Sequence, residues 1–215
     1  MHFLSDALEG YIRDHSEDEP KLLQELTRET HLKVVQPRMI TGHFQGRVLS
    51  MLSKIIQPKN ILEIGSYTGY SAICLSEGLQ KGGQLHTIDI NEELTDIQRR
   101  YFDKSGLGEQ IMQHTGDALE IIPELDVCFD LVFIDAEKVS YDAYFEAVLK
   151  KTKPGSIILS DNVLWSGKVV EPLNTKDKAT KVLLEYNQKL KKDPRVETVL
   201  LPIRDGLTLC RVLKG

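Results

Sequence analysis

Acidic and amide side chains follow two apolar runs of the sequence, at the points where those runs end. LVFI (131 to 134) leads into Asp135, and SIILS (156 to 160) leads into Asp161 and Asn162. Because the carboxyl ends of parallel strands meet at one rim of a sheet, we expect these three side chains to converge. Two carboxylates and an amide oxygen form a hard ligand set that suits Mg²⁺, Mn²⁺ or Ca²⁺, whereas zinc and copper usually recruit histidine or cysteine. The sequence therefore predicts a divalent-metal site at this rim.

A lysine stands next to the predicted metal site. Lys138 follows Asp135 by three residues. It is therefore placed to approach an oxygen of a substrate bound at the predicted metal site, either as a general base or as a charge partner. Lysines are mostly exposed and solvated, and that interpretation would prevail without the neighbouring acid. The six histidines show no ligand-like spacing, so we assign them structural or solvent roles.

Polar residues after the earlier apolar runs predict a nucleoside pocket. The first run ends in Glu63 and the turn GSYTG (65 to 69), whose two glycines let backbone approach a ligand. The second run ends at Asp89, 24 residues beyond Gly65, about where an acid binds ribose hydroxyls. Asp117, after the third run, is placed to accept a hydrogen bond from an adenine amino group.

The glycine pattern of this turn limits the kind of nucleotide. It reads G-x-x-x-G and lacks the middle glycine of G-x-G-x-x-G, which makes room for a pyrophosphate. A glycine turn alone often serves only a tight bend. With acids at three successive strand ends, however, the pattern favours an adenosyl ligand without phosphates over NAD or FAD.

A doubly covered parallel sheet would bring these residues together. Continuous apolar strands that alternate with helices are typical of such an α/β fold. The last two runs are joined by PIRDG (202 to 206), which favours a hairpin and one antiparallel strand at the end of the sheet. The expected strands span 61 to 64, 84 to 88, 111 to 115, 131 to 134, 156 to 160, 197 to 201 and 207 to 212. The expected helices of this part span 71 to 80, 92 to 104, 141 to 151 and 178 to 192.

The region before the first strand is expected to be helical. Residues 3 to 31 predict two amphipathic helices, and residues 42 to 56 predict a third. Leu4, Leu8, Tyr11 and Ile12 form the apolar stripe of the first, and Leu22, Leu23, Leu26 and Thr30 that of the second. We interpret residues 1 to 215 as a single domain with residues 1 to 58 as its N-terminal helical extension.

Composition places few restrictions on function. Of the 215 residues, 41% are hydrophobic and 27% charged, as in ordinary globular proteins. A formal net charge of -5 gives no general attraction to nucleic acid or anionic lipid. Three widely spaced cysteines are typical of reduced core thiols and favour the cytoplasm. We expect neither a signal peptide nor a membrane-spanning helix.

Several segments together resemble a known family, the cation-dependent class I O-methyltransferases that use S-adenosylmethionine (SAM). This family includes catechol O-methyltransferase and, more closely similar, the caffeoyl-CoA O-methyltransferase group. The resemblance spans nearly the whole chain and is carried by SDALEGYI, MITGHFQG, LEIGSYTGYSA, TIDI, GDALE, FIDAEKVSY, KPGSIILSDNVLWSGKV and LPIRDGLTLCRV. It implies a Rossmann-like seven-stranded sheet with a reversed last strand and, commonly, a homodimer.

The resemblance also implies residue roles. Asp135, Asp161 and Asn162 match the metal ligands, and Lys138, beside Asp135, matches the catalytic base. Trp165, with Lys138, matches the acceptor side of the pocket. Positions that match the methyl-donor site are Met39, Thr41, Glu63, Gly65, Ser71, Asp89, Ala118, Asp135 and Tyr144, and we place Ser66, Ile90 and Asp117 in the same predicted site.

The implied reaction is methyl transfer to one hydroxyl of a catechol-type small molecule, with the metal ion lowering the pKa of that hydroxyl. Two segments depart from the family pattern. Gln45, Gly46, Arg47 and Val48 replace a stretch in which an acid often precedes Gly-Gln-Phe. The segment from 169 to 178 is polar and has no aromatic residue, which favours a bacterial-type enzyme with broad catechol acceptance.

Three other functions remain open at this point. The first is methylation of a 5-hydroxyuridine in tRNA, with a basic patch from Lys150, Lys151, Lys153, Lys168, Lys189, Lys191 and Lys192. A solvated helix face is the preferred interpretation of those lysines. The second is a non-catalytic SAM-binding regulatory module, which would need neither a metal nor a base. The third is a dinucleotide oxidoreductase.

Overall fold

The computed structural model describes residues 5–174 and 176–214, with the backbone alone at Asp6. The chain divides into an N-terminal unit, residues 4–117, and a C-terminal unit, residues 118–215. Phe3 and Leu4, which were expected in the first helix, lie outside the described residues. The prediction of a single domain with a helical extension stays a prediction.

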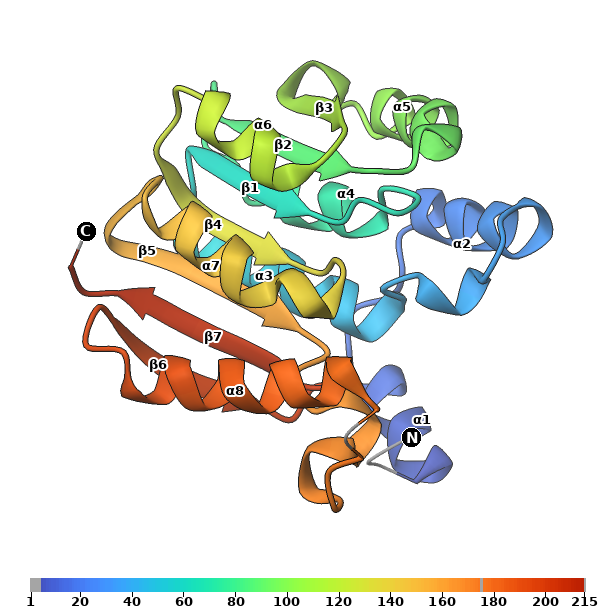
Figure 1. Ribbon diagram of the computed structural model, residues 1–215. Helices are drawn as coiled ribbons and strands as arrows, with labels where there is room; N and C mark the ends of the chain where they lie inside the picture. Colours follow the sequence, from blue (N-terminus) through green and yellow to red (C-terminus); the bar gives the residue numbers. More distant parts are fainter. Residues whose placement is uncertain (1–4, 175, 215) are drawn as a thin grey trace. The chain divides into compact units, whose positions relative to one another are not determined.

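Three parallel strands form the sheet of the N-terminal unit, in the order β3-β2-β1 (Figure 1). They are β1 (Asn60–Ile64), β2 (Gln84–Asp89) and β3 (Ile111–Thr115), within one residue of the predicted bounds. Ile64 pairs with Ile88, and Asp89 pairs with Thr115, so the three strands end level with one another. The residues at and after these ends therefore share one rim, which we call the nucleoside rim.

Five α-helices lie among the described residues of this unit. They are α1 (Asp6–Asp14), α2 (Lys21–Lys33), α3 (His43–Ile56), α4 (Tyr70–Ser76) and α5 (Thr95–Lys104). The two helices predicted before residue 31 are confirmed. Of the predicted stripe, α2 buries Leu23, Leu26 and Thr30, whereas Leu22 is only partly buried. The predicted apolar stripe of α1 is not buried in the same way, because Leu8 and Tyr11 are 46% and 61% exposed.

Helix α4 is shorter than its predicted span of residues 71 to 80. The chain after it passes so close to α3 that a Cβ atom on Gly78 would lie 2.2 Å from the Ser53 backbone carbon. On α3 itself, a Cβ on Gly46 would lie 2.6 Å from the ring of Tyr70. Beside this contact, the Arg47 guanidinium donates to both carboxylate oxygens of Glu77, at 3.0 and 2.7 Å. The departure from the family pattern at residues 45 to 48 thus contributes to packing between α3 and α4.

Four strands form the sheet of the C-terminal unit, in the order β4-β5-β7-β6. They are β4 (Phe129–Ile134), β5 (Thr152–Asp161), β6 (Val196–Leu201) and β7 (Leu207–Val212). Strands β4 and β5 are parallel, whereas β7 is antiparallel to both β5 and β6. The chain therefore has the seven-stranded, mostly parallel architecture with a reversed last strand that the sequence predicts.

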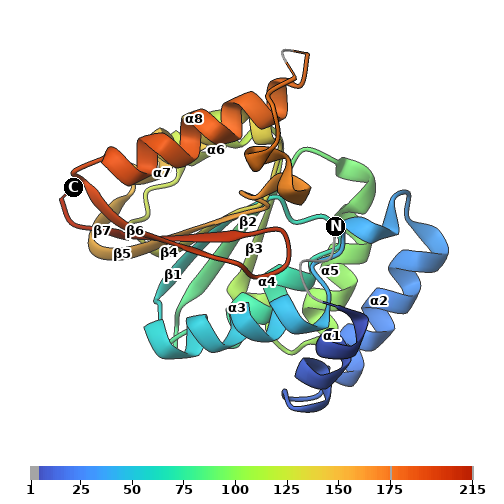
Figure 2. The same cartoon turned by 90° about the horizontal axis from the view of Figure 1, so that it is seen from below.

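The α-helices among the described residues of the C-terminal unit are α6 (Ala118–Glu124), α7 (Tyr141–Leu149) and α8 (Lys178–Lys192), and Figure 2 shows them along one face of its strands. Helix α8 has the predicted bounds, and α7 ends two residues before its predicted end at residue 151. Helix α6 was not predicted, because it is short and contains Pro123. Its first residue, Ala118, is buried.

The cysteines are free, as predicted, but they are not all core residues. Cys74 and Cys210 are buried, and burial raises the pKa of their thiols to about 12 and about 11. Cys128 is exposed instead, which corrects the expectation that it belongs to the core. Within residues 5–174 and 176–214, no helix combines the length and apolar character that a membrane crossing needs.

Candidate functional site

The carboxylate of Asp89 is held at the nucleoside rim by two backbone groups. The N–H of Tyr67 donates to Oδ2 at 2.7 Å, and the N–H of Asn91 donates to Oδ1 at 2.9 Å. The turn after β1 is tied to the same place, because the Gly65 N–H donates to the Ile88 carbonyl at 2.9 Å. A carboxylate fixed in this way keeps further lone pairs with which to accept hydrogen bonds from ligand hydroxyls.

The turn that contacts Asp89 has a strained backbone. Gly65, Tyr67 and Gly69 have φ angles of 99°, 48° and 90°, in the region that favours glycine. Tyr67 is not glycine, and its conformation is supported by Gln98, whose Nε2 donates to the Tyr67 carbonyl at 2.7 Å. Backbone strain of this kind gathers at ligand sites and persists where neighbouring contacts enforce it.

A chain of buried polar groups lies behind the turn. The Thr87 hydroxyl donates to Oε2 of Glu63 at 2.5 Å and also contacts the Ser66 hydroxyl. Glu63 is fully buried, and a buried carboxylate must be compensated by such hydrogen bonds. The structure thus brings Glu63, Ser66 and the Asp89 turn together at the end of β1 and β2.

The remaining predicted cofactor residues differ in exposure. Thr41 and Ser71 are buried, whereas Met39 and Ile90 are 55% and 78% exposed and Asp117 is also exposed. Ala118 and Tyr144 are buried residues of the C-terminal unit. That these residues and those of the nucleoside rim line one methyl-donor site stays a prediction.

The predicted metal ligands lie at the ends of β4 and β5. Ile134 pairs with Ser160 in parallel register, so Asp135, directly after β4, and Asp161, the last residue of β5, come next on neighbouring strands. Asp161 is 3% exposed and Asp135 is partly buried. The Asn162 N–H donates to Oδ1 of Asp161 at 2.8 Å, which orients this carboxylate. We call the end of β4 and β5 the acid rim.

Lys138 is not the solvated lysine that its residue type alone would suggest. Its side chain is 10% exposed, and Nζ donates to Oδ1 of Asp135 at 3.0 Å. Nζ also donates to the hydroxyl of Tyr141 at 2.6 Å and lies 4.7 Å from the centre of that ring. The ammonium group is therefore fixed against one of the two acids of the acid rim.

Tyr141 connects the members of the acid rim and was missed from the sequence. Its hydroxyl donates to the Asp161 carbonyl at 2.8 Å and lies 3.3 Å from the Ile134 carbonyl. Burial, together with the charges of Asp135 and Asp161, raises the pKa of this tyrosine well above its usual value, so the hydroxyl stays protonated. The available signal was its position three residues after Lys138, which reads as an ordinary core tyrosine of a helix.

A left-handed turn follows the acid rim. Asn162, Trp165 and Ser166 have φ angles of 58°, 47° and 55°, and Gly167 has 82°. Asparagine tolerates this region better than other non-glycine residues, whereas tryptophan and serine enter it at a cost. The indole N–H of Trp165 is buried and has no hydrogen-bond partner among the described residues.

The donor set of the acid rim fits a hard divalent cation. Two carboxylates and one amide supply oxygen atoms only, as Mg²⁺, Mn²⁺ and Ca²⁺ prefer. Among residues 5–174 and 176–214, no group of three or more histidine, cysteine, aspartate and glutamate side chains is placed to hold a metal. The predicted set contains only two such residues, Asp135 and Asp161, and it stays a prediction.

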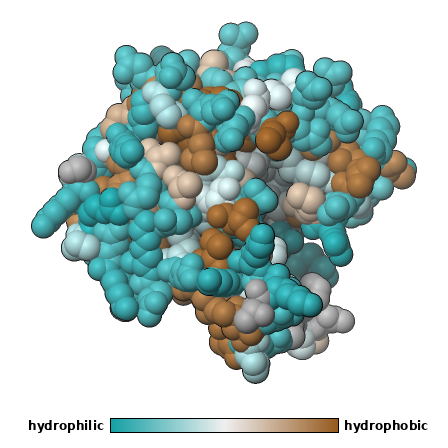
Figure 3. All heavy atoms as spheres, viewed as in Figure 1, coloured by the Kyte–Doolittle hydropathy of each residue, from teal (hydrophilic) through white to brown (hydrophobic). Residues whose placement is uncertain are grey.

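Most of the lysines proposed for a nucleic-acid patch have other partners. Lys153, Lys168 and Lys189 form ion pairs with Asp130, Asp177 and Glu146, at 2.7, 3.0 and 2.7 Å. Lys151 Nζ donates to the carbonyls of Pro123 and Leu125, at 2.8 and 2.7 Å. Lys150, Lys191 and Lys192 are exposed, and the surface over α8 is largely hydrophilic (Figure 3). This arrangement is that of a solvated, charge-paired surface.

Two histidines form a structural pair, in line with the role expected for them. The imidazoles of His86 on β2 and His114 on β3 are stacked with centroids 5.2 Å apart, and Nδ1 of His86 lies 3.0 Å from Nε2 of His114. Burial, and next the charge of His114, lowers the pKa of His86 to about 4. Both rings are therefore neutral at physiological pH.

Comparison with known proteins identifies close relatives of the whole chain. Caffeoyl-CoA O-methyltransferase from Petroselinum crispum is 36% identical over 220 residues, covering 96% of this chain and 91% of the relative. Caffeoyl-CoA O-methyltransferase 2 from Eucalyptus globulus is 37% identical, covering 96% of this chain and 89% of the relative.

Solved structures match at the same breadth. The O-methyltransferase TomG from Streptomyces achromogenes, in complex with SAM, has a TM-score of 0.89 and 29% identity and covers 96% of both chains. An O-methyltransferase from Bacillus cereus, in complex with S-adenosylhomocysteine (SAH), has a TM-score of 0.89 and 30% identity, covering 96% of this chain and 97% of that one. Residues 13–213 match the family model described as O-methyltransferase. This match, together with the full-length relatives, confirms the resemblance inferred from the sequence: the chain belongs to the O-methyltransferase family, a family of enzymes.

Proposed function

We propose that this chain transfers the methyl group of SAM to one hydroxyl of a catechol-type small molecule, in a reaction that depends on a divalent metal ion such as Mg²⁺. The observation that carries this proposal is the acid rim, where Asp135 follows β4, Asp161 ends the paired strand β5, and Lys138 is fixed on Asp135. Relatives in complex with SAM and SAH support the choice of methyl donor.

The nucleoside rim supplies the groups that a methyl donor needs. Asp89, preorganised by two backbone N–H groups, accepts hydrogen bonds from the ribose hydroxyls. The turn at Gly65, which has no Cβ, lets backbone approach the ligand, and exposed Ile90 offers an apolar surface to the adenine ring. Asp117 is proposed to accept a hydrogen bond from the adenine amino group. Because no pyrophosphate has to fit, the G-x-x-x-G turn is suited to SAM.

The acid rim supplies the groups that activate the acceptor. A divalent cation held by Asp135, Asp161 and Asn162 would bind both oxygens of a vicinal diol and lower the pKa of one hydroxyl. As an ammonium ion Lys138 pairs with the phenolate; after it has lost a proton to solvent, its neutral amine receives the hydroxyl proton. Its contacts with Asp135 and Tyr141 hold Nζ in place for either role. The phenolate oxygen forms a bond to the methyl carbon while the carbon–sulfur bond breaks, and SAH leaves. Positioning and electrostatic stabilisation account for the rate.

A small catechol fits the surface better than tRNA does. The lysines that would have formed a basic patch are largely paired with acids or backbone carbonyls. The segment from 169 to 178, where the acceptor is expected to be selected, has no aromatic residue. Caffeoyl-CoA is a test substrate because relatives carry its name.

The proposal is tested by offering the purified chain labelled SAM with one acceptor at a time. The acceptors are a simple catechol, its monohydroxy analogue, caffeoyl-CoA and 5-hydroxylated tRNA, each with Mg²⁺ and with EDTA. We expect Mg²⁺-dependent labelling of the catechol and none of the monohydroxy analogue. Preferential labelling of tRNA would overturn the acceptor class, and binding of SAM without transfer to any acceptor would favour the regulatory module.

A further inference from the structure

The turn that follows the acid rim is unusually strained for the residues it contains. Asn162, Trp165 and Ser166 all have φ between 47° and 58°, and Gly167 has 82°. Each non-glycine residue in this region carries an energetic cost, because its Cβ is crowded by the following carbonyl oxygen. The turn therefore needs contacts from outside itself to stay in this conformation.

The hairpin between β6 and β7 supplies those contacts. The backbone N–H of Val163 donates to the Gly206 carbonyl at 3.2 Å, and that of Leu164 donates to the Asp205 carbonyl at 2.9 Å. The Ser166 N–H donates to the side-chain Oδ1 of Asp205 at 2.5 Å. Asp205 thus contacts the turn on both sides of Trp165, once through its backbone and once through its carboxylate.

The fit between hairpin and turn is close. A Cβ atom on Gly206 would lie 2.5 Å from Cγ and 2.9 Å from the backbone nitrogen of Leu164, and Gly206 itself has a φ of 90°. From the other direction, Nδ2 of Asn187 on α8 donates to the Val163 carbonyl at 2.9 Å. The turn is enclosed on two sides, so its conformation depends on these neighbours.

We propose that Asp205 is a positioning residue for the transfer reaction, one that acts by holding the left-handed turn between Asn162 and Gly167. This inference rests on the proposed function, because Asn162 and Trp165 are the predicted metal ligand and acceptor-side aromatic residue. The two lie three residues apart in the same turn, so a change of its backbone moves both. The backbone contacts of the hairpin are available to any residue at position 205, whereas the bond to the Ser166 N–H requires a side chain with an acceptor oxygen.

The predicted consequence concerns how the acceptor is oriented. A catechol offers two hydroxyls, and the ratio of the two methylated products reports which one faces the methyl donor. A loosened turn would allow the acceptor to rotate. Partners that orient metal ligands from outside the ligand set typically contribute about 10- to 100-fold to activity, and we expect a loss of that size in kcat/KM for Asp205→Ala.

The test uses Asp205→Ala and Asp205→Asn, with Glu197→Ala as the matched control. Asparagine keeps an acceptor oxygen for the Ser166 N–H, so we expect it to retain most of the activity and the product ratio. Glu197 lies on the same hairpin and pairs with Arg211 on the surface, with 59% of its side chain exposed. Its removal should therefore change neither the activity nor the product ratio. Circular dichroism and thermal melting establish that each variant is folded.

A second measurement does not depend on activity. Trp165 is the single tryptophan of the chain, so tryptophan fluorescence reports on this turn alone. We expect a red-shifted emission and lower anisotropy in the metal-free Asp205→Ala variant, with restoration in Asp205→Asn. Should Asp205→Ala fail to fold, Asp205→Leu, which removes the acceptor oxygen and keeps a side chain of similar size, provides the same comparison.

The outcomes separate this inference from the proposed function. A wild-type chain that transfers no methyl group to catechols would end the proposed function, and with it the positioning role, even if the Asp205→Ala emission shifts. A folded Asp205→Ala variant with unchanged emission, product ratio and kcat/KM would overturn the positioning role and leave the proposed function intact.

Discussion

At the scale of single residues, Lys138 has the most specific environment. Its ammonium group is nearly buried between Asp135 and the Tyr141 hydroxyl. Lysine side chains are seldom buried, so this position indicates a specific role. A general base or phenolate partner needs this fixed position, because proton transfer in the transition state depends on hydrogen-bond geometry. The residue is therefore the first to test by substitution.

We expect Lys138→Met to lower kcat by about 10²- to 10⁴-fold, the usual contribution of a positioned acid or base. Binding of SAH, measured by calorimetry, should stay within error, because the nucleoside rim is proposed to hold the cofactor. Lys181→Ala, at an exposed position of α8, is the matched control and should behave as wild type. An unchanged kcat in Lys138→Met would remove this lysine from the mechanism.

Asp89 provides a test of the nucleoside rim. Its carboxylate accepts hydrogen bonds from the N–H groups of Tyr67 and Asn91 and is proposed to bind the ribose hydroxyls. We expect Asp89→Ala to weaken SAH binding by about 10- to 100-fold, because charge-assisted hydrogen bonds contribute about 1.5–3 kcal/mol. The exposed Asp96→Ala on α5 serves as control. NADH should bind neither protein, and tight NADH binding would revive the dinucleotide interpretation.

Individual site residues were predictable where their position in the chain carries the signal. Asp135 and Asp161 follow apolar runs directly, so their place at a strand end could be read without the structure. Tyr141, Thr87 and Asp205 could not be found in this way. Their roles depend on side-chain hydrogen bonds to residues that are distant in sequence or belong to another element, as between Asp205 and Ser166.

At the scale of elements, the apolar runs predicted all seven strands, because a fully covered strand needs continuous hydrophobic residues. The helix bounds were harder to predict. Helix α4 ends early where Gly78 packs on the α3 backbone, which is a tertiary contact with no local sequence signal. Helix α6 has only seven residues and includes a proline, so no periodic pattern could identify it.

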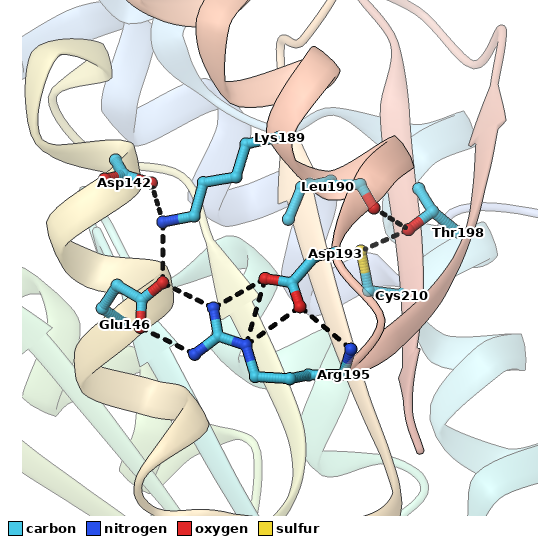
Figure 4. Close-up of polar contacts among 8 residues, drawn as sticks. All are labelled: Asp142, Glu146, Lys189, Leu190, Asp193, Arg195, Thr198 and Cys210. Atoms are coloured by element: carbon cyan, nitrogen blue, oxygen red, sulfur yellow. Dashed lines mark hydrogen bonds and ion pairs between the residues drawn. The ribbon is translucent and has the colours of Figure 1, made fainter. Parts of the chain in front are cut away.

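A network of ion pairs joins α7, α8 and the residues before β6 (Figure 4). Lys189 on α8 contacts Asp142 and Glu146 on α7, the latter at 2.7 Å. Arg195 donates to both oxygens of Glu146, at 3.0 and 2.7 Å, and to Asp193. These contacts, chiefly the hydrogen bond from Arg195, lower the pKa of Glu146 to about 2.

We expect Arg195→Ala to destabilise the fold by about 1 kcal/mol, at the upper end for a partly exposed pair, because it removes a partner from two carboxylates. Arg211→Ala, which breaks a single exposed pair with Glu197, should have no measurable effect. Urea unfolding at pH 7 measures both. The difference should shrink as pH falls from about 4.5 toward 2, where Glu146 takes up its proton. Equal stabilities of the two variants would contradict the network's role.

The His86 and His114 pair predicts a separate pH dependence. The folded pKa of His86, about 4, lies below its usual value of 6.5, so the unfolded chain binds more protons between these values. Protonation of His86 in the unfolded chain should therefore leave the free energy of unfolding almost unchanged above pH 6.5 and lower it as pH falls toward 4. The expected decrease that His86 causes between pH 7.5 and pH 5 is about 2 kcal/mol. Urea unfolding of wild type and His86→Phe at both pH values measures the contribution. An identical pH dependence in the variant would exclude His86 as its source.

At the scale of the whole molecule, the family relation and the two rims point to the same reaction. The chain matches O-methyltransferases over nearly its entire length, and one unit carries the nucleoside rim while the other carries the acid rim. The proposal of a catechol as acceptor depends chiefly on the acid rim, because a hard cation held there would bind a vicinal diol through two oxygens.

The central claim is that transfer requires a divalent cation held by Asp135, Asp161 and Asn162. The most direct measurement is the rate of methyl transfer from SAM to a catechol by chelated enzyme, before and after Mg²⁺ is restored, in wild type and in Asp161→Ala. We predict that chelation abolishes transfer, that Mg²⁺ restores it in wild type, and that Asp161→Ala, though folded and able to bind SAH, is not restored. Full transfer by the chelated wild type, or restoration of Asp161→Ala to the wild-type rate, would contradict the account.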